Sequence, residues 1–221
     1  MSIVSYIVIA LAMGVVNMLL FRRCGEATPV RLSTGLFIVV VVSAIHVALY
    51  YLGSRVGELL SLRSPSDPHM YDDYNAYIFL GINLVVVIKL LVPYLRKEPR
   101  LPLFNMEKRG SLLPMALATG INVLLVGLGT GFVENGDAVH KLIWPLLIAS
   151  MLLGYLGLMF GRQKVQLRPR RWMIFASVLL LGTAIAALIE ISYRRMDYDC
   201  RIVISMNRKR LRRNCSVGAF F

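Results

Sequence analysis

Six long apolar stretches constrain this chain more than any other feature of its sequence. Each approaches or exceeds the roughly 20 residues that a helix needs to cross a bilayer, and they lie near residues 2–21, 34–54, 74–95, 111–133, 142–161 and 172–192. Hydrophobic residues make up 57% of the chain and charged residues only 17%. In hydrocarbon, a spanning segment must bond its own backbone polar groups. The sequence therefore predicts an all-α integral membrane protein with six transmembrane helices, surrounded by a lipid bilayer.

A charged segment that contains Pro99 and Pro102 separates the six stretches into two sets of three. Because each set holds an odd number of spans, the second set enters the membrane from the opposite side, which predicts two inverted repeats. The expected organisation is a first three-helix repeat over residues 1–95, a cytoplasmic linker over 96–110, a second three-helix repeat over 111–192, and a basic, disordered tail over 193–221.

Positive charge in the loops predicts the orientation of the chain. Arg and Lys are concentrated after the first, third and fifth stretches, whereas the other two loops are richer in Asp and Glu. Since basic loops stay in the cytoplasm, we expect both termini outside and a multi-pass protein in the cell inner (plasma) membrane. The basic tail, 193–221, runs against this orientation. The net charge of +13 thus reflects topology, and we expect no nucleic-acid partner.

Two asparagines occupy matching places in two of the apolar stretches. Asn17 is in the first and Asn122 in the fourth, and each precedes a hydrophobic triplet that ends in Leu-Leu. An amide in hydrocarbon is costly unless it has a partner. Two amides at matching places in two half-chains therefore suggest a shared intramembrane site. A helix-packing face, with Asn122 bonded to a neighbouring helix, is the alternative for the second of them.

Four further residues in the apolar stretches could line such a site. His46 offers a neutral imidazole, a good ligand for Mn, Zn or Fe, although an imidazole that is bonded across helices explains it equally well. Thr119 precedes Asn122 by three residues, so their oxygens share a helix face, and Gly120 lies between them. Lys89 either lines the pore or extends its amine to the cytoplasmic interface.

Enzyme signatures are missing from the sequence. There is no P-loop, no Gly-rich dinucleotide turn, no HExxH and no assignable Ser-His-Asp set. The sequence therefore predicts a membrane protein that is not an enzyme and that needs no cofactor.

The chain resembles the small six-span manganese efflux pumps of the MntP type, within the LysE-like exporter superfamily, over residues 1–191. In that family the first span has a Ser-hydrophobic-Asp-Ala motif, and the fourth has a Thr-Ser-hydrophobic-Asp motif. The matching stretches here are Val15-Val16-Asn17-Met18 and Thr119-Gly120-Ile121-Asn122. His46 stands seven residues before Gly53, where the family has Glu or Gln, and Lys89 matches a basic residue of the third span.

The resemblance implies a membrane transporter that works by alternating access at the repeat interface. It implies Mn²⁺ or another divalent cation as substrate, held by Asn17, His46 and Asn122. Both family aspartates are Asn here, so the implied site is neutral. Two alternatives remain open: a non-transporting membrane scaffold with the same fold, and an exporter of a small neutral or zwitterionic solute. Coupling ion and oligomeric state have no signature in the sequence.

Overall fold

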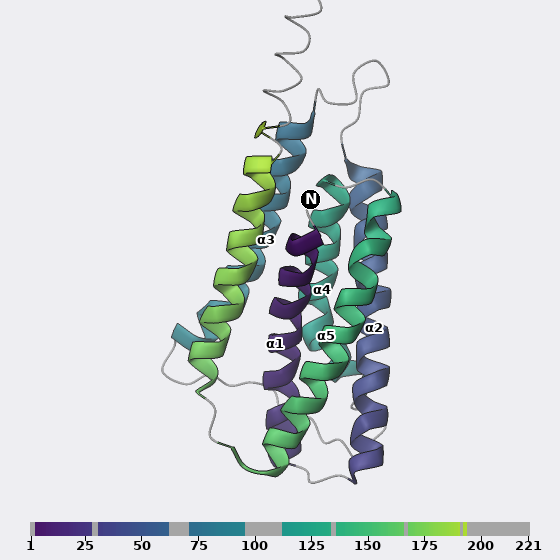
Figure 1. Cartoon of the computed structure of the whole chain (residues 1–221), viewed down its shortest axis with the longest axis vertical. Helices are drawn as coiled ribbons and strands as arrows, with labels where there is room; N and C mark the ends of the chain where they lie inside the picture. The colour runs from purple at the N-terminus through teal and green to yellow at the C-terminus, as the bar shows by residue number, and fades with distance from the viewer. Residues whose placement is uncertain are drawn as a thin grey trace, which may run out of the picture.

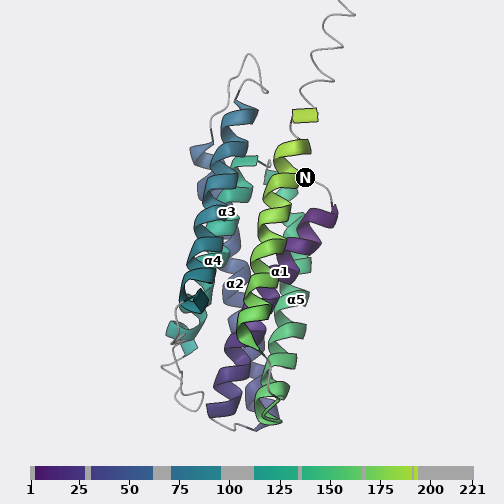
Figure 2. The same ribbon diagram turned by 90° about the vertical axis from the view of Figure 1, so that its left-hand side faces the viewer.

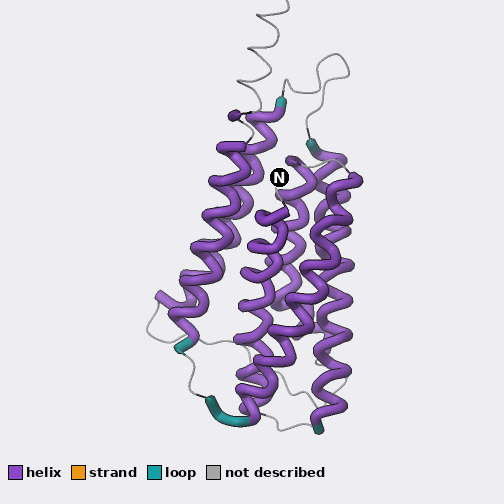
Figure 3. Tube along the Cα trace, viewed as in Figure 1, coloured by secondary structure: helices purple, strands orange, loops and turns teal. Residues whose placement is uncertain are grey.

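A computed structural model of the chain describes residues 3–27, 31–61, 71–95, 112–133, 136–165, 168–190 and 192–193. Five labelled helices run through these residues: α1 (Ile3–Ala27), α2 (Leu32–Leu60), α3 (Asp72–Leu95), α4 (Leu112–Val133) and α5 (Gly136–Arg162) (Figure 1). A sixth helix, Pro169–Glu190, is drawn in yellow-green without a label. All six are long and apolar enough to cross a membrane. The part of the chain that the structure describes contains no strand (Figure 3), which confirms the prediction of an all-α protein with six spanning helices.

The helices extend beyond the apolar stretches. α1 continues past Arg22 to Ala27, and α2 continues past Arg55 to Leu60. Charged residues lower hydropathy without interrupting a helix, because Arg and Glu are good helix formers. At the end of α2, the Ser61 hydroxyl donates to the Glu58 carbonyl at 2.7 Å. The membrane boundary and the helix boundary are therefore different features of this chain.

Successive helices run in opposite directions, so their ends gather at two ends of the bundle. α1 and α5 end at the lower end in Figure 1, where the sixth helix begins, and the N-terminus lies toward the upper end. The Arg residues near the end of α1, Arg22 and Arg23, thus lie at the same end of the bundle as those after α5. The side of the membrane that this end faces stays a prediction. The linker 96–110 and, apart from Tyr193, the tail 193–221 lie outside the described residues.

The tightest helix pairs join the two half-chains. α1 packs mainly against α5 and α2 mainly against α4, while α3 packs against α4. Figure 2 shows α3 and the sixth helix as the outer helices of one side of the bundle. If α1 to α3 form one repeat, α1 is the first helix of that repeat and packs against α5, the second helix of the other. In the same way α2, the second helix of the first repeat, packs against α4, the first helix of the other. This arrangement is consistent with two inverted repeats.

Glycines make these two interfaces close. A Cβ atom at any of four positions would overlap a backbone carbonyl oxygen of the partner helix, so only Gly fits there. Gly53 and Gly57 of α2 face Leu124 and Leu128 of α4, and Gly157 and Gly161 of α5 face Met18 and Arg22 of α1. The same contacts recur at both interfaces, because Gly53 corresponds to Gly157, Gly57 to Gly161, Met18 to Leu124, and Arg22 to Leu128.

This contact register corrects one prediction. Because Met18 corresponds to Leu124, Asn17 corresponds to Val123 and not to Asn122. Asn122 in turn corresponds to Val16. The sequence motif suggested equivalent asparagines, and that equivalence is wrong by one residue. Since each residue turns an α-helix by about 100°, the two amides occupy different faces of corresponding helices.

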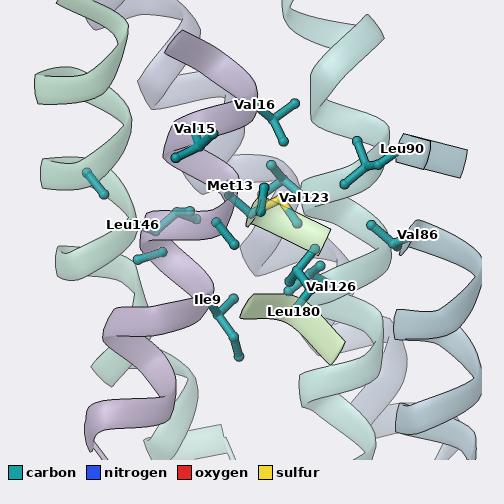
Figure 4. Close-up of a cluster of buried hydrophobic side chains, with 14 of the residues drawn as sticks. Ile9, Met13, Val15, Val16, Val86, Leu90, Val123, Val126, Leu146 and Leu180 are labelled. Carbon is teal, nitrogen blue, oxygen red and sulfur yellow. The ribbon is translucent and has the colours of Figure 1, made fainter. Parts of the chain in front are cut away.

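An apolar cluster fills the centre of the bundle. Figure 4 shows side chains from α1, α3, α4, α5 and the sixth helix that meet there, among them Met13, Val123 and Leu180. Polar side chains buried beside such a cluster have no bulk water to bond, so each needs a protein partner or a ligand. This setting constrains the candidate site.

Candidate functional site

His46 joins three helices in the interior of the bundle. Its side chain, on α2, is fully buried, and Asn17 of α1 is 1% exposed. The His46 Nδ1 lies 2.9 Å from the Asn17 Nδ2, and the His46 Nε2 lies 2.9 Å from the Thr119 Oγ1 of α4. One imidazole therefore connects two helices of the first half-chain to one helix of the second.

The hydrogen bonds fix the tautomer of this imidazole. An amide nitrogen can only donate, so the Asn17 Nδ2 donates to Nδ1 of His46. The proton of the neutral ring is then on Nε2, which donates to the Thr119 hydroxyl and lies 3.3 Å from the carbonyl oxygen of Ala116. Both ring nitrogens are thus occupied by protein groups in this conformation.

Gly120 lies beside the ring. A Cβ atom there would lie 3.4 Å from the His46 Cδ2 and would overlap the Leu49 side chain. The predicted residues Asn17, His46, Thr119 and Gly120 are therefore brought together. Ala116 is an addition that the sequence gave no way to find, since its contribution is a backbone carbonyl.

The two asparagines share one property with several other buried polar residues of the described chain, Asn83 and Ser150 among them. The Oδ1 atoms of Asn17 and Asn122 are both buried without a hydrogen-bond partner. A buried unsatisfied amide oxygen costs about 1–3 kcal/mol, so native proteins satisfy most of these oxygens with a protein group, an ordered water or an ion. These oxygens are acceptors to which a ligand could bind.

Asn122 faces a different neighbour from Thr119. It stands seven residues before Gly129, so the two share a face of α4. A Cβ atom at Gly129 would lie 2.9 Å from the Phe79 ring and 3.5 Å from the Asn83 Nδ2, both on α3. Asn122 therefore lies on the side of α4 that faces α3, and no hydrogen bond joins it to His46 among the described contacts.

The position that corresponds to His46 in the other half-chain has apolar neighbours. The contact register maps His46 onto Ser150 of α5, Asn17 onto Val123 and Thr119 onto Met13. The Ser150 hydroxyl is buried without a partner, and Val123 and Met13 belong to the apolar cluster. The polar site is thus present once and not twice, although the packing around it is repeated.

Lys89 does not join the buried cluster. Its side chain is exposed on α3, next to Ile88, which is also exposed. Lys89 therefore lies on the outer surface of α3, apart from His46, in this conformation. A pore-lining role for Lys89 stays a prediction.

Two other polar contacts were not assigned from the sequence. The hydroxyl groups of Tyr50 and Thr130 lie 3.1 Å apart, which links α2 to α4 one turn beyond His46. Asn83 donates to the Phe79 carbonyl of its own helix at 2.9 Å, and its Oδ1 is buried without a partner. Asn83 offered a signal, a lone amide in an apolar stretch.

Six helices that are long and apolar enough to cross a membrane indicate a multi-pass membrane protein. A polar cluster between two half-chains is the kind of site that transporters use. A family model described as "Mntp: Putative manganese efflux pump" matches residues 29–188, and the chain belongs to this family. The match includes His46, Lys89, Thr119 and Asn122, whereas α1, with Asn17, precedes it. Comparison with curated proteins found no match, and comparison with solved structures also found none.

Proposed function

We propose that the chain exports a divalent cation, with Mn²⁺ as the first candidate, across the inner (plasma) membrane by alternating access of two inverted repeats. We place it among transporters and not among enzymes, and assign it no cofactor. The observation that carries the proposal is the His46 bridge, which joins Asn17 of the first half to Thr119 of the second. Movement of one half against the other would open and close this bridge.

Cation binding requires Asn17 to turn. In the described conformation its Nδ2 occupies the Nδ1 lone pair of His46. A half-turn of the amide would exchange Nδ2 for Oδ1, the oxygen that now has no partner. Imidazole nitrogen and amide oxygen would then point at one cation, while Thr119 holds the Nε2 proton and with it the required tautomer.

The charge of the site sets its selectivity. Among the described residues, no three of His, Cys, Asp and Glu gather where they could hold a metal ion. A hard cation such as Mn²⁺ prefers carboxylate oxygens, whereas an imidazole suits Zn²⁺ and similar ions better. We therefore expect weaker Mn²⁺ binding than a site with two aspartates would give.

The runner-up function is a membrane scaffold that keeps the fold without transport. It is favoured by the occupation of both His46 nitrogens, which is how a purely structural interhelical bond would look. The uncharged cluster also keeps a neutral or zwitterionic solute in consideration as substrate.

Metal accumulation separates these functions. A strain without its own manganese exporter would receive wild type, His46→Leu or an empty vector, and cell-associated Mn²⁺ and Zn²⁺ would be measured at matched protein levels. We expect wild type alone to lower accumulation of at least one of the two metals. Equal accumulation of both metals in all three strains would refute cation export and favour the scaffold or a neutral solute.

A further inference from the structure

The turn after α5 and the start of the sixth helix carry a group of exposed cations. Five Arg or Lys side chains are exposed there: Arg162, Lys164, Arg168, Arg170 and Arg171. The sequence has no Asp or Glu between Asp137 and Glu190. Within the described part of the chain, none of the five forms an ion pair with a carboxylate. A local charge of this size attracts anions unless something neutralises it.

The turn is held in one shape. The amide of Val165 donates to the Phe160 carbonyl at 3.0 Å, and that of Lys164 donates to Gly161 at 3.1 Å. These two bonds form a Schellman motif at the end of α5. From α1, the Arg22 side chain donates to the Val165 carbonyl at 3.0 Å and fixes the turn to a second helix.

Lys164 occupies the position in this motif that normally takes Gly. Its φ is 51°, a left-handed conformation that residues with a side chain rarely adopt. Glycine would remove the strain. A residue that persists in a strained conformation suggests a function for its side chain, and the property that Lys has and Gly lacks is a cationic amine.

The neighbouring residues place these cations at the membrane surface. Trp172 follows them directly, 37% exposed, with its ring 6.2 Å from that of Phe175 in an edge-to-face arrangement. Phe175 and Val178 continue as exposed apolar residues of the sixth helix. Exposed Trp is typical of the interface between hydrocarbon and headgroups. The five cations are therefore at the level where lipid phosphates lie.

We propose that this surface, which we call the α5 basic turn (Arg162, Lys164, Arg168, Arg170 and Arg171), is a binding site for the headgroups of anionic phospholipids. The phosphate would accept hydrogen bonds from the guanidinium groups, and the acyl chains would lie along Phe175 and Val178. Each Lys or Arg near an anionic surface contributes about 1 kcal/mol, which corresponds to roughly five-fold in affinity. The proposal does not depend on what the protein transports.

The test compares purified full-length protein in nanodiscs of phosphatidylcholine with and without phosphatidylglycerol. Thermal unfolding and lipid retention in native mass spectrometry would be measured for wild type, for Arg168→Gln/Arg170→Gln/Arg171→Gln, and for the charge-preserving triple change to Lys. We expect phosphatidylglycerol to raise the Tm of wild type and of the Lys variant. In the Gln variant, the Tm rise should be largely lost, and each removed cation should lower lipid affinity about five-fold.

Lys164→Gly separates a structural role from a binding role. In phosphatidylcholine it should raise the Tm, because glycine relieves the strain. In phosphatidylglycerol its Tm gain should be smaller than that of wild type, because one cation is lost. Lys141→Gln removes an exposed cation at the opposite end of the bundle and should leave the lipid-dependent shift unchanged.

Two outcomes would overturn the proposal. One is an equal phosphatidylglycerol shift in wild type and the triple Gln variant, which would show that the lipid acts elsewhere. The other is a full Tm shift with inorganic phosphate alone in phosphatidylcholine, which would assign the α5 basic turn to a soluble anion.

Discussion

The surroundings of His46 and of Ser150 have the same helix packing but differ in the side chains that line them. Polar side chains surround His46, and apolar side chains surround Ser150. Both positions lie on second helices of a half-chain, and both helices pack through glycines against a first helix of the other half. Around His46 the neighbours are Asn17 and Thr119, whereas the places that correspond to them around Ser150 hold Val123 and Met13. Backbone contact is therefore conserved between the two regions, while side-chain chemistry is not.

The physical reason is that the packing glycines tolerate substitution less well than the polar side chains do. A glycine whose Cβ would overlap a backbone carbonyl permits no substitution, because the obstacle cannot move aside. A polar side chain can be exchanged for an apolar one when its partners change too, since the loss is then nearly neutral. The comparison teaches that the close glycine packing recurs in both half-chains, whereas the polar site is present in one of them. The predictions below test these two statements.

The largest expected effect is on packing, and it should be the same in both regions. Gly57→Ala and Gly161→Ala each place a methyl group onto a backbone carbonyl of the partner helix. Overpacking costs typically 1–3 kcal/mol, and a rigid obstacle places these sites at or above the upper end. We expect little folded protein from either variant by fluorescence size-exclusion chromatography.

The matched control for this prediction uses two open glycines. A Cβ atom at Gly81 or Gly182 would meet nothing within 4 Å, and Ala favours a helix over Gly by up to about 1 kcal/mol. Both Ala variants should therefore keep or exceed the wild-type yield. A normal yield of folded protein for Gly161→Ala, together with a strongly reduced yield for Gly57→Ala, would mean that the two helix interfaces do not depend on glycine in the same way.

The second effect should be confined to one region. His46→Leu leaves the Asn17 amide and the Thr119 hydroxyl without their partner, at about 1–3 kcal/mol for each unsatisfied group. We expect a lower Tm in detergent and loss of metal export. In His46→Gln, the amide can again form hydrogen bonds with the neighbouring helices. We therefore expect a Tm close to that of wild type, but still no metal export. Recovery of both would show that the imidazole itself is dispensable.

The third effect tests the one-residue difference between the asparagines. Asn17→Asp places a carboxylate next to Nδ1 of His46, where it can share a cation with the imidazole. Asn122→Asp places one on the face of α4 toward α3. We expect Asn17→Asp to raise Mn²⁺ affinity at least ten-fold, about 1.4 kcal/mol, by isothermal titration calorimetry, and Asn122→Asp to raise it less. Equal gains would indicate that both residues contact one ion.

The smallest effect is expected at Ser150, the residue that corresponds to His46 in the other half-chain. Ser150→Ala removes a buried hydroxyl that has no partner, so the unfolding free energy should stay constant or rise by less than about 1 kcal/mol. Export should be unchanged. A loss of export in this variant, with the Tm intact, would reveal a second functional polar position and weaken the contrast with His46.

Much of the fold could be predicted from the sequence. The six apolar stretches indicated six spanning helices because hydrocarbon imposes length and composition on each segment separately. Basic loops indicated which connections share one side for an equally local reason. His46 and Asn17 stood out because a polar side chain in an apolar stretch is visible without knowing its partner.

The tertiary structure alone decided how the polar residues pair. Asn17 and Asn122 have matching sequence surroundings, yet glycine contacts set the register so that Asn17 corresponds to Val123. A helix turns by about 100° per residue, so a shift of one residue sends a side chain to another neighbour. The exposure of Lys89 was also decided by the tertiary structure, because it depends on which face of α3 packs inward. The sequence determined which residues are buried at a cost, and helix packing determined which of them meet.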